Sequence, residues 1–182
     1  YCDQDRTHIG NVNVGFETPR FNNAVLRAVA SSWGISAIYS ARSGIPFSVV
    51  TGVDTALSGI SNQRANQVSD DVYGEPQEDA QGRLANYLDR NAFVSPAAGS
   101  VGTSVRNSVR GPSYWNGINL GLRRLVQLSG TQNIELRIES FNLLNSFIWG
   151  QPVNNLGSGQ FGRITTQAGE PRIMQFAVKY GF

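Results

Sequence analysis

The last eleven residues of the chain, Arg172 to Phe182, alternate between two kinds of side chain. Successive side chains of a strand point to opposite faces, so this alternation predicts a strand with one wholly apolar face. The apolar series is Met174, Phe176, Val178, Tyr180 and Phe182. A tilted strand needs about 9 to 11 residues to cross a bilayer, but a half-buried strand of a soluble antiparallel sheet shows the same period. The pattern therefore indicates a β-sheet and leaves both settings open.

Composition excludes several classes of protein. The chain has 182 residues, 40% of them apolar, and a mean hydropathy of -0.23. The longest apolar-looking stretch, residues 24–41, is interrupted by Arg27 and several serines, so no segment is expected to span a membrane as a helix. The net charge is +2 and the basic residues are scattered, which argues against a nucleic-acid partner. The single cysteine, Cys2, cannot form an internal disulfide.

Four further segments show strand-like alternation. The segment from Tyr114 to about Leu128 places Arg124 directly after Arg123, so this strand is expected to need a bulge there to keep its alternation in phase. The segment from Trp33 to about Thr51 is longer than strands of soluble sheets usually are, and a bend is expected in it at Ser43-Gly44. The four are His8 to Glu17, Trp33 to about Thr51, Tyr114 to about Leu128 and Asn133 to about Leu144. With the terminal segment they predict an all-β, antiparallel, up-and-down sheet of about five strands.

The connections between these strands differ greatly in length. A tight turn at Ser129 to Gln132 joins the third and fourth strands, whereas a long surface loop, 52–113, separates the second and third. Residues 145–171 separate the last two. In an up-and-down sheet the long connections fall on one side and the shorter ones on the other, as in outer-membrane barrels. This sorting favours a membrane barrel over a soluble sandwich.

Charged and polar side chains occupy the face of the last strands opposite the apolar one. In a barrel they would point into a watery or plugged lumen, whereas an Arg facing lipid near the midplane would cost about 2 to 4 kcal/mol. The alternative is a solvated sheet face whose cross-strand ion pairs each contribute roughly 0.2 to 1 kcal/mol. The residues are Glu135, Arg137, Glu139, Gln175 and Lys179.

The sequence contains little that would indicate a catalytic site or a metal site. His8 is the only histidine, and no G-x-S-x-G nucleophile motif is present, so no catalytic site is expected. An acidic run from Asp70 to Asp79 could bind a cation but lacks EF-hand spacing and is interpreted as a solvated loop. We expect no cofactor, no metal and no enzyme activity. Aromatic residues around the long loop could stack on a glycan or a chelate, and Tyr114 and Trp115 are interpreted as outer-girdle residues.

Several segments together resemble the C-terminal part of TonB-dependent outer-membrane receptors, most closely the Oar-like subgroup, whose members carry a carboxypeptidase-regulatory-like domain. They include RNSVRGP at Arg106 to Pro112, FNLLN at Phe141 to Asn145, FGRI at Phe161 to Ile164, and the terminal aromatic after PRIMQF, and it is their joint occurrence that carries the resemblance. They occur in the order and spacing of that family, and the similarity covers nearly the whole chain. The resemblance implies a fragment of a barrel of about 22 strands, with the plug domain and earlier strands in sequence outside this chain.

The resemblance also implies partners and roles. Uptake of a scarce or bulky nutrient would use surface loops for capture and an inner-membrane TonB protein, coupled through the absent N-terminal region, for energy. Arg123 would join the lumen-lining residues, and Phe176, Val178, Tyr180 and Phe182 would form the signal for the barrel-assembly machinery. The substrate could be a glycan, a peptide or a metal chelate. The expected location is the outer membrane, in contact with its lipid.

Two other functions remain open on the sequence. A surface adhesion or assembly barrel would use the long loop to contact a partner, and an upstream plug and coupling box would argue against it. A soluble β-sandwich binding module predicts a monodisperse protein without detergent.

Overall fold

The computed structural model describes residues 2–80 and 83–182. Residues 81 and 82, within the predicted loop 52–113, lie outside the described part. The chain divides into two compact units. The strand unit comprises residues 8–42, 115–147 and 170–182, and the loop unit comprises residues 2–7, 43–80, 83–114 and 148–169.

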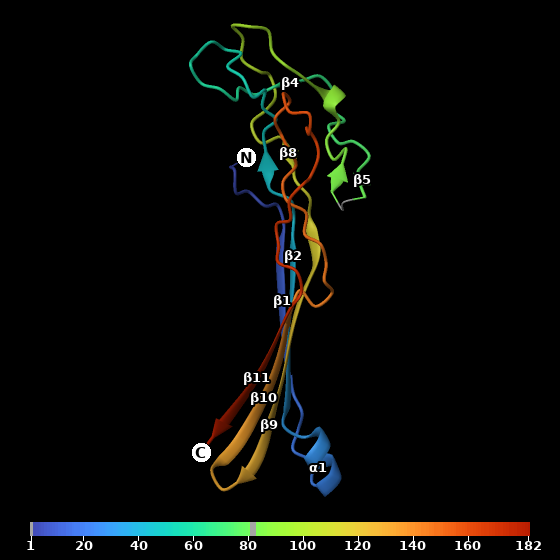
Figure 1. The fold of residues 1–182 in the computed structure, drawn as a ribbon, viewed down its shortest axis with the longest axis vertical. Coiled ribbons are helices and arrows are strands. Elements are labelled where there is room, and N and C mark those ends of the chain that lie inside the picture. The colour runs from blue at the N-terminus through green and yellow to red at the C-terminus, as the bar shows by residue number, and fades with distance from the viewer. Residues whose placement is uncertain (1, 81–82) are drawn as a thin grey trace. The chain divides into compact units, whose positions relative to one another are not determined.

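The strand unit is built on one five-stranded sheet (Figure 1). Its strands lie in chain order, and β1 with β2, β9 with β10, and β10 with β11 pair antiparallel. They are β1 (Ile9–Glu17), β2 (Trp33–Arg42), β9 (Tyr114–Ser129), β10 (Gln132–Phe141) and β11 (Ile173–Gly181). The predicted antiparallel up-and-down sheet is thus confirmed. β1 and β11 form its two edges.

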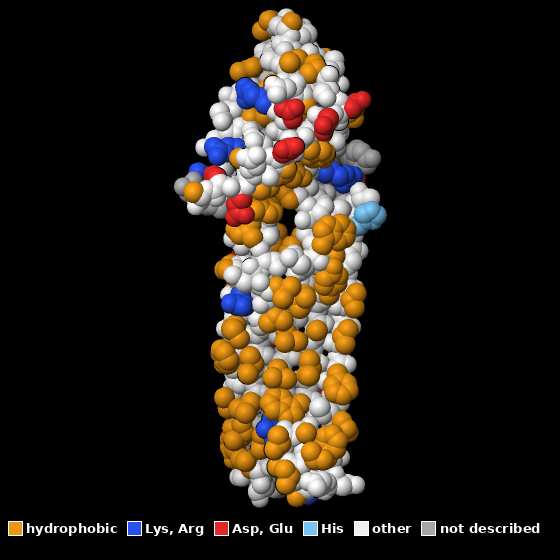
Figure 2. All heavy atoms as spheres, turned by 90° about the vertical axis from the view of Figure 1, so that its right-hand side faces the viewer, with side chains coloured by type: hydrophobic (Ala, Val, Ile, Leu, Met, Phe, Trp, Pro, Cys, Tyr) orange, Lys and Arg blue, Asp and Glu red, His pale blue; other side chains and the backbone are white. Residues whose placement is uncertain are grey.

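The registers gather most of the large apolar side chains of the strands on one face, here called the apolar face. In β10 and β11, Ile138 lies opposite Phe176 and Leu136 opposite Val178. At the other edge, Phe16 lies opposite Ile35. Figure 2 shows hydrophobic side chains distributed along the strands, with few charged side chains among them. These side chains are largely exposed: Phe176 is 71% and Val178 is 73% exposed. An exposed apolar surface of this size is unfavourable in water.

The connections at one end of the sheet are the shorter ones. β9 and β10 are joined at residues 130–131, where Gly130 has φ +49, a left-handed conformation that glycine adopts readily. Residues 18–32 join β1 and β2. The chain leaves the opposite end of the strands for the two long connections, 43–113 and 142–172. The predicted sorting of connections by length is confirmed.

A short helix that the sequence did not predict interrupts the β1–β2 connection. α1 (Ala24–Ala30) begins after Asn23, whose side-chain oxygen accepts hydrogen bonds from the Val25 and Leu26 amides at 2.9 and 3.2 Å. An Asn in this position satisfies amides that have no partner within the helix. In the described part of the chain no helix has the length and apolar character needed to cross a membrane.

The second strand is shorter than expected. The prediction carried it to about Thr51, but β2 ends at Arg42, and β3 (Pro46–Phe47) belongs to a separate ladder with β8 (Val109–Arg110). Pro46 has no amide hydrogen to continue a sheet. The regular strand ends just before the expected bend at Ser43-Gly44, and the Gly44 amide donates to Ser113 Oγ at 3.2 Å.

The loop unit has a hydrophobic core of its own. Two more short ladders, β4 (Asn66–Gln67) with β7 (Phe93–Val94) and β5 (Gln77–Glu78) with β6 (Leu84–Ala85), and a 3-10 helix, η1 (Arg90–Ala92), lie along the long connection. The buried cluster is Val49, Ala65, Val72, Leu88, Ala92, Phe93, Val109, Leu156 and Phe161. The predicted surface loop is therefore a folded segment that packs with residues 148–169.

Candidate functional site

The polar face of the sheet carries all six residues that the sequence marked as lumen-lining. The register places Glu135 opposite Lys179 and Glu139 opposite Gln175. It also places Arg137 opposite Arg123. Because directly opposed residues share a face, β9, β10 and β11 bring these six side chains together. Whether they line a lumen stays a prediction.

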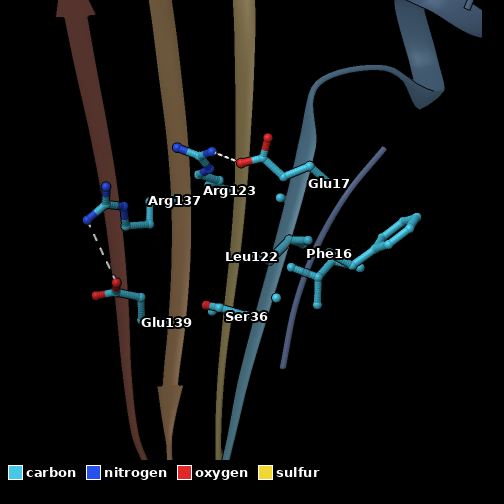
Figure 3. Close-up of a pocket in the computed structure, with 11 residues that line it drawn as sticks. Phe16, Glu17, Ser36, Leu122, Arg123, Arg137 and Glu139 are labelled. Carbon is cyan, nitrogen blue, oxygen red and sulfur yellow. Dashed lines mark hydrogen bonds and ion pairs between the residues drawn. The ribbon is translucent and has the colours of Figure 1, made fainter. Parts of the chain in front are cut away.

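An ion pair crosses three strands on this face. Arg123 of β9 pairs with Glu17 of β1, and the intervening strand β2 has Gly34 directly opposite Glu17 (Figure 3). A Cβ atom at residue 34 would lie 2.7 Å from Arg123 Nε, closer than real Cβ atoms approach. The absence of a side chain at Gly34 thus leaves the space in which Arg123 reaches across β2.

A second cluster of charges lies along β10. Arg137 donates a hydrogen bond to Glu135 at 2.7 Å and lies 3.8 Å from Glu139. Arg123 and Arg137 are like charges on directly opposed residues, an arrangement that repels. Each guanidinium has its own carboxylate, which offsets that repulsion. The charges on this face are therefore largely neutralised in pairs.

Two adjacent grooves follow this polar face. The larger has a volume of about 420 Å³, and Figure 3 shows Glu17, Arg123, Arg137 and Glu139 around it. The smaller, about 260 Å³, shares Glu17, Gly34 and Arg123 with it and adds Glu135. Fixed guanidinium and carboxylate groups beside small side chains suit a polar or charged occupant held by charge-assisted hydrogen bonds.

The apolar face carries the residues marked as an assembly signal. Phe176, Val178 and Tyr180 lie on it, and the Tyr180 and Phe182 rings stack with centroids 6.0 Å apart. Phe182 is 93% exposed. This arrangement forms an exposed aromatic pair at the end of β11. The assembly role stays a prediction.

The predicted bulge at Arg124 is wrong. The β9–β10 register runs unbroken past this residue, and the shift lies between Gln132 and Asn133 beside the turn. Arg124 therefore falls on the apolar face, opposite Leu136, while Leu125 falls on the polar face. The guanidinium is accommodated because it donates to the Ala28 carbonyl and lies over a tryptophan ring. Sequence alternation alone does not show such tertiary partners.

Side chains of the long connection that the sequence singled out have structural roles in the loop unit. Asp79, from the acidic run, pairs with Arg83 at 2.8 Å and Arg163 at 3.3 Å. Within residues 2–80 and 83–182, no group of three or more His, Cys, Asp or Glu side chains is placed to hold a metal ion.

Two tyrosines of the long connection form an edge-to-face pair. The Tyr73 and Tyr87 rings lie 5.7 Å apart, and the Tyr87 hydroxyl donates to the Arg110 carbonyl at 3.0 Å. Burial, with a smaller effect from Tyr73, raises the pKa of Tyr87 above its usual range. Phe93 is buried against Phe161. Tyr87 and Phe93 are therefore packed within the loop unit and do not form a freely exposed stacking surface.

Sequence reasoning missed two participants on the polar face. The sequence pattern places Glu17 at the end of the first strand and assigns it no role, and it gives no reason to single out Gly34. Glu17 could have been found as the charged residue at a polar position of the first alternating segment. Gly34 could not, because its importance comes from a neighbour 89 positions along the chain, Arg123.

Comparison with known proteins identifies the architecture. Residues 1–175 match the family model described as Outer membrane beta barrel domain. Searches of curated proteins and of solved structures gave no match. The match covers nearly the whole chain and agrees with the antiparallel sheet, its exposed apolar face and its opposite polar face. The chain therefore belongs to the outer membrane beta barrel domain family and is located in the outer membrane.

Proposed function

We propose that this chain supplies five strands to the barrel of a TonB-dependent receptor of the Oar-like type, which takes up a scarce or bulky nutrient. The observation that carries the proposal is the contrast between the two faces of the sheet. One face is apolar and exposed, whereas the other holds paired charges around two grooves. A wide barrel needs this division between its lipid surface and a polar interior.

The number of strands supports a larger barrel. The smallest single-chain outer-membrane barrels have about eight strands, and here β1 and β11 are the open edges of a five-stranded sheet. Each edge needs a neighbour to satisfy its backbone groups inside a membrane. In the proposed receptor, preceding strands and a plug domain provide the remaining wall and the gate.

In this proposal the polar face contributes to the transport path. Arg123, Glu135, Arg137, Glu139, Gln175 and Lys179 line the lumen or hold the plug through ion pairs. The loop unit contributes to capture of a glycan, a peptide or a metal chelate at the surface. Outer-membrane lipid surrounds the apolar face, and the barrel-assembly machinery recognises the terminal strand.

The test uses the full-length gene product and the purified periplasmic domain of TonB. The receptor proposal predicts that the two bind in detergent micelles, and that deleting a coupling box from the full-length protein removes the binding. A full-length product without a plug or coupling box, and without TonB binding, would exclude energised transport.

A surface adhesion or assembly barrel is the second candidate, and the core of the loop unit favours it. Val49, Val109 and Ile164 are almost completely buried there, so the long connections form a folded surface. An adhesion barrel predicts that a full-length variant lacking residues 52–113 loses binding to the cell or surface partner. It also predicts no association with the periplasmic TonB domain.

A further inference from the structure

We propose that α1 is an interfacial anchor whose apolar side inserts into the phospholipid leaflet at the short-connection end of the sheet. This inference depends on membership of the outer-membrane family and is independent of nutrient uptake. Its basis is an exposed apolar helix that the structure fixes on the lipid side of the sheet.

The first observation is the surface of the helix. Val25, Leu26 and Val29 are 71%, 49% and 63% exposed. At 3.6 residues per turn these three positions share one side of the helix, and Arg27 lies on the opposite side. The helix has only seven residues, and a helix that short is marginal in water on its own. Such a helix with apolar residues on one side and a basic residue on the other suits a membrane interface.

The second observation is a set of contacts that fix the end of the helix. The Trp33 indole N–H donates to the Val29 carbonyl at 2.8 Å, and Arg124 donates to the Ala28 carbonyl. The Arg124 guanidinium carbon lies 5.0 Å from the centre of the Trp33 ring. We call Trp33, Arg124 and these two carbonyls the latch. The latch satisfies carbonyls that a helix end leaves without intrahelical partners.

The latch determines the side of the sheet on which α1 lies. Arg124 is on the apolar face, opposite Leu136. Trp33 directly precedes Gly34 in β2, and Gly34 lies under Arg123 on the polar face. Consecutive side chains of a strand point to opposite faces, so Trp33 points to the apolar face, as Arg124 does. The helix is therefore attached to the surface that contacts lipid.

The position along the sheet selects the leaflet. α1 lies at the same end of the strand unit as the β9–β10 turn and the chain's C-terminus (Figure 1). The stacked Tyr180 and Phe182 rings lie at this end too. Tyr and Trp side chains favour the boundary between headgroups and acyl chains. The apolar side of α1 thus continues the lipid-facing surface into that boundary.

Charge favours phospholipid as the occupant. α1 has no acidic residue in its first turn and has Arg27 in its last. Arg124 lies beneath the end of the helix. Basic side chains around an inserted apolar edge attract the phosphate groups of a lipid leaflet. A water-filled surface would offer no partner for the exposed valines and leucine.

The experiment measures the depth of the helix directly. The full-length protein, free of other cysteines, is reconstituted in vesicles of equal parts phosphatidylethanolamine and phosphatidylglycerol. Val25→Cys, Val29→Cys and Arg27→Cys variants each carry an environment-sensitive fluorophore. Spin-labelled lipids with the quencher near the headgroup or deep in the acyl chain then report the position of each label.

We expect the headgroup-level quencher to reduce fluorescence at residues 25 and 29 several-fold more than at residue 27. Aqueous iodide should show the reverse order. Equal lipid quenching at all three positions overturns the proposal. Labels at 25 and 29 that are shielded from iodide yet not quenched by lipid would also overturn it, because a protein partner or a second copy would then cover α1.

A second variant tests the latch without touching the inserted side. Trp33→Phe removes the indole hydrogen bond to Val29, and Trp115→Phe is the matched control in β9. With correct folding verified by heat-modifiable gel mobility, we expect lipid quenching at residue 29 to fall several-fold in Trp33→Phe only. Unchanged quenching would show that the latch does not hold the helix in the leaflet.

Discussion

The side chain of Arg123 lies directly over Gly34, so that a Cβ atom at residue 34 would be 2.7 Å from Arg123 Nε and 2.9 Å from its Cγ. This contact lets a guanidinium on β9 reach a carboxylate on β1 across the strand between them. A Cβ atom at residue 34 would therefore require the Arg123 side chain to shift.

Gly34→Ala should stabilise the protein less than Gly15→Ala does, or should destabilise it. A glycine in a strand costs roughly 0.5 to 1 kcal/mol relative to alanine, so removing it is favourable where space allows. A Cβ atom at Gly15 meets nothing within 4 Å, whereas one at Gly34 collides with Arg123. Chemical unfolding of the full-length protein in lipid vesicles measures the difference, and equal effects would mean that Arg123 does not cross Gly34.

The Glu17–Arg123 pair should show a small, salt-sensitive coupling energy. Both side chains are more than half exposed, at 70% and 52%, and exposed pairs contribute about 0.2 to 1 kcal/mol. A double-mutant cycle of Glu17→Gln and Arg123→Gln should give a coupling in this range. It should fade in about 1 M salt, where screening acts within roughly 3 Å. A coupling that resists salt would indicate a polar face shielded from water.

The alternating patterns predicted the five strands and their faces because each strand buries or exposes every second residue along its own length. The ends of β1, β9 and β11 fall within one residue of the expected positions. The six marked polar residues share one face for the same reason. Local periodicity contains this information.

The loop unit, α1 and the surroundings of Arg124 were not predictable in this way. Val49, Ala65 and Leu156 meet in one core although they are far apart in sequence and follow no period. α1 has too few residues for a helical period to be recognised within the apolar stretch 24–41. Arg124 can occupy a position on the apolar face because its guanidinium lies over the Trp33 ring and donates a hydrogen bond to a helix carbonyl. Both contacts join separate segments of the chain.

Ile164→Ala should destabilise the loop unit far more than Ile60→Ala. Ile164 is completely buried, whereas Ile60 is 67% exposed. Replacing a buried isoleucine by alanine costs about 2 to 5 kcal/mol, because it removes apolar contacts and leaves a cavity. Hydrogen exchange of peptides covering residues 84–94 should accelerate strongly in the first variant only. Similar exchange in both variants would contradict a cooperative core in the loop unit.

The stability of the turn at Asp54 should decrease as the pH falls below the usual range of aspartate. The Ser58 amide, and to a smaller extent the Gly59 amide and the Ser58 hydroxyl, hold the pKa of Asp54 below its ordinary value of 3.8. The ionised carboxylate accepts these bonds at 3.1 Å from Ser58 N and 2.6 Å from Gly59 N. A group whose pKa is lower in the folded state stabilises the fold above its ordinary pKa, and loses that effect as the pH drops toward the lowered value.

Asp54→Asn keeps an oxygen acceptor but removes the charge, so it isolates this effect. Hydrogen exchange of peptides covering residues 54–63, compared between variant and wild type at each pH, cancels the intrinsic pH dependence of exchange. The variant should exchange faster at neutral pH, and the difference should vanish as the pH falls below 3.8. Asp3→Asn serves as a parallel case at another place in the loop unit. Hydrogen bonds from Asn107 and Arg106 lower the pKa of Asp3 in the same direction. A difference that persists unchanged in acid would show that the carboxylate charge does not support the turn.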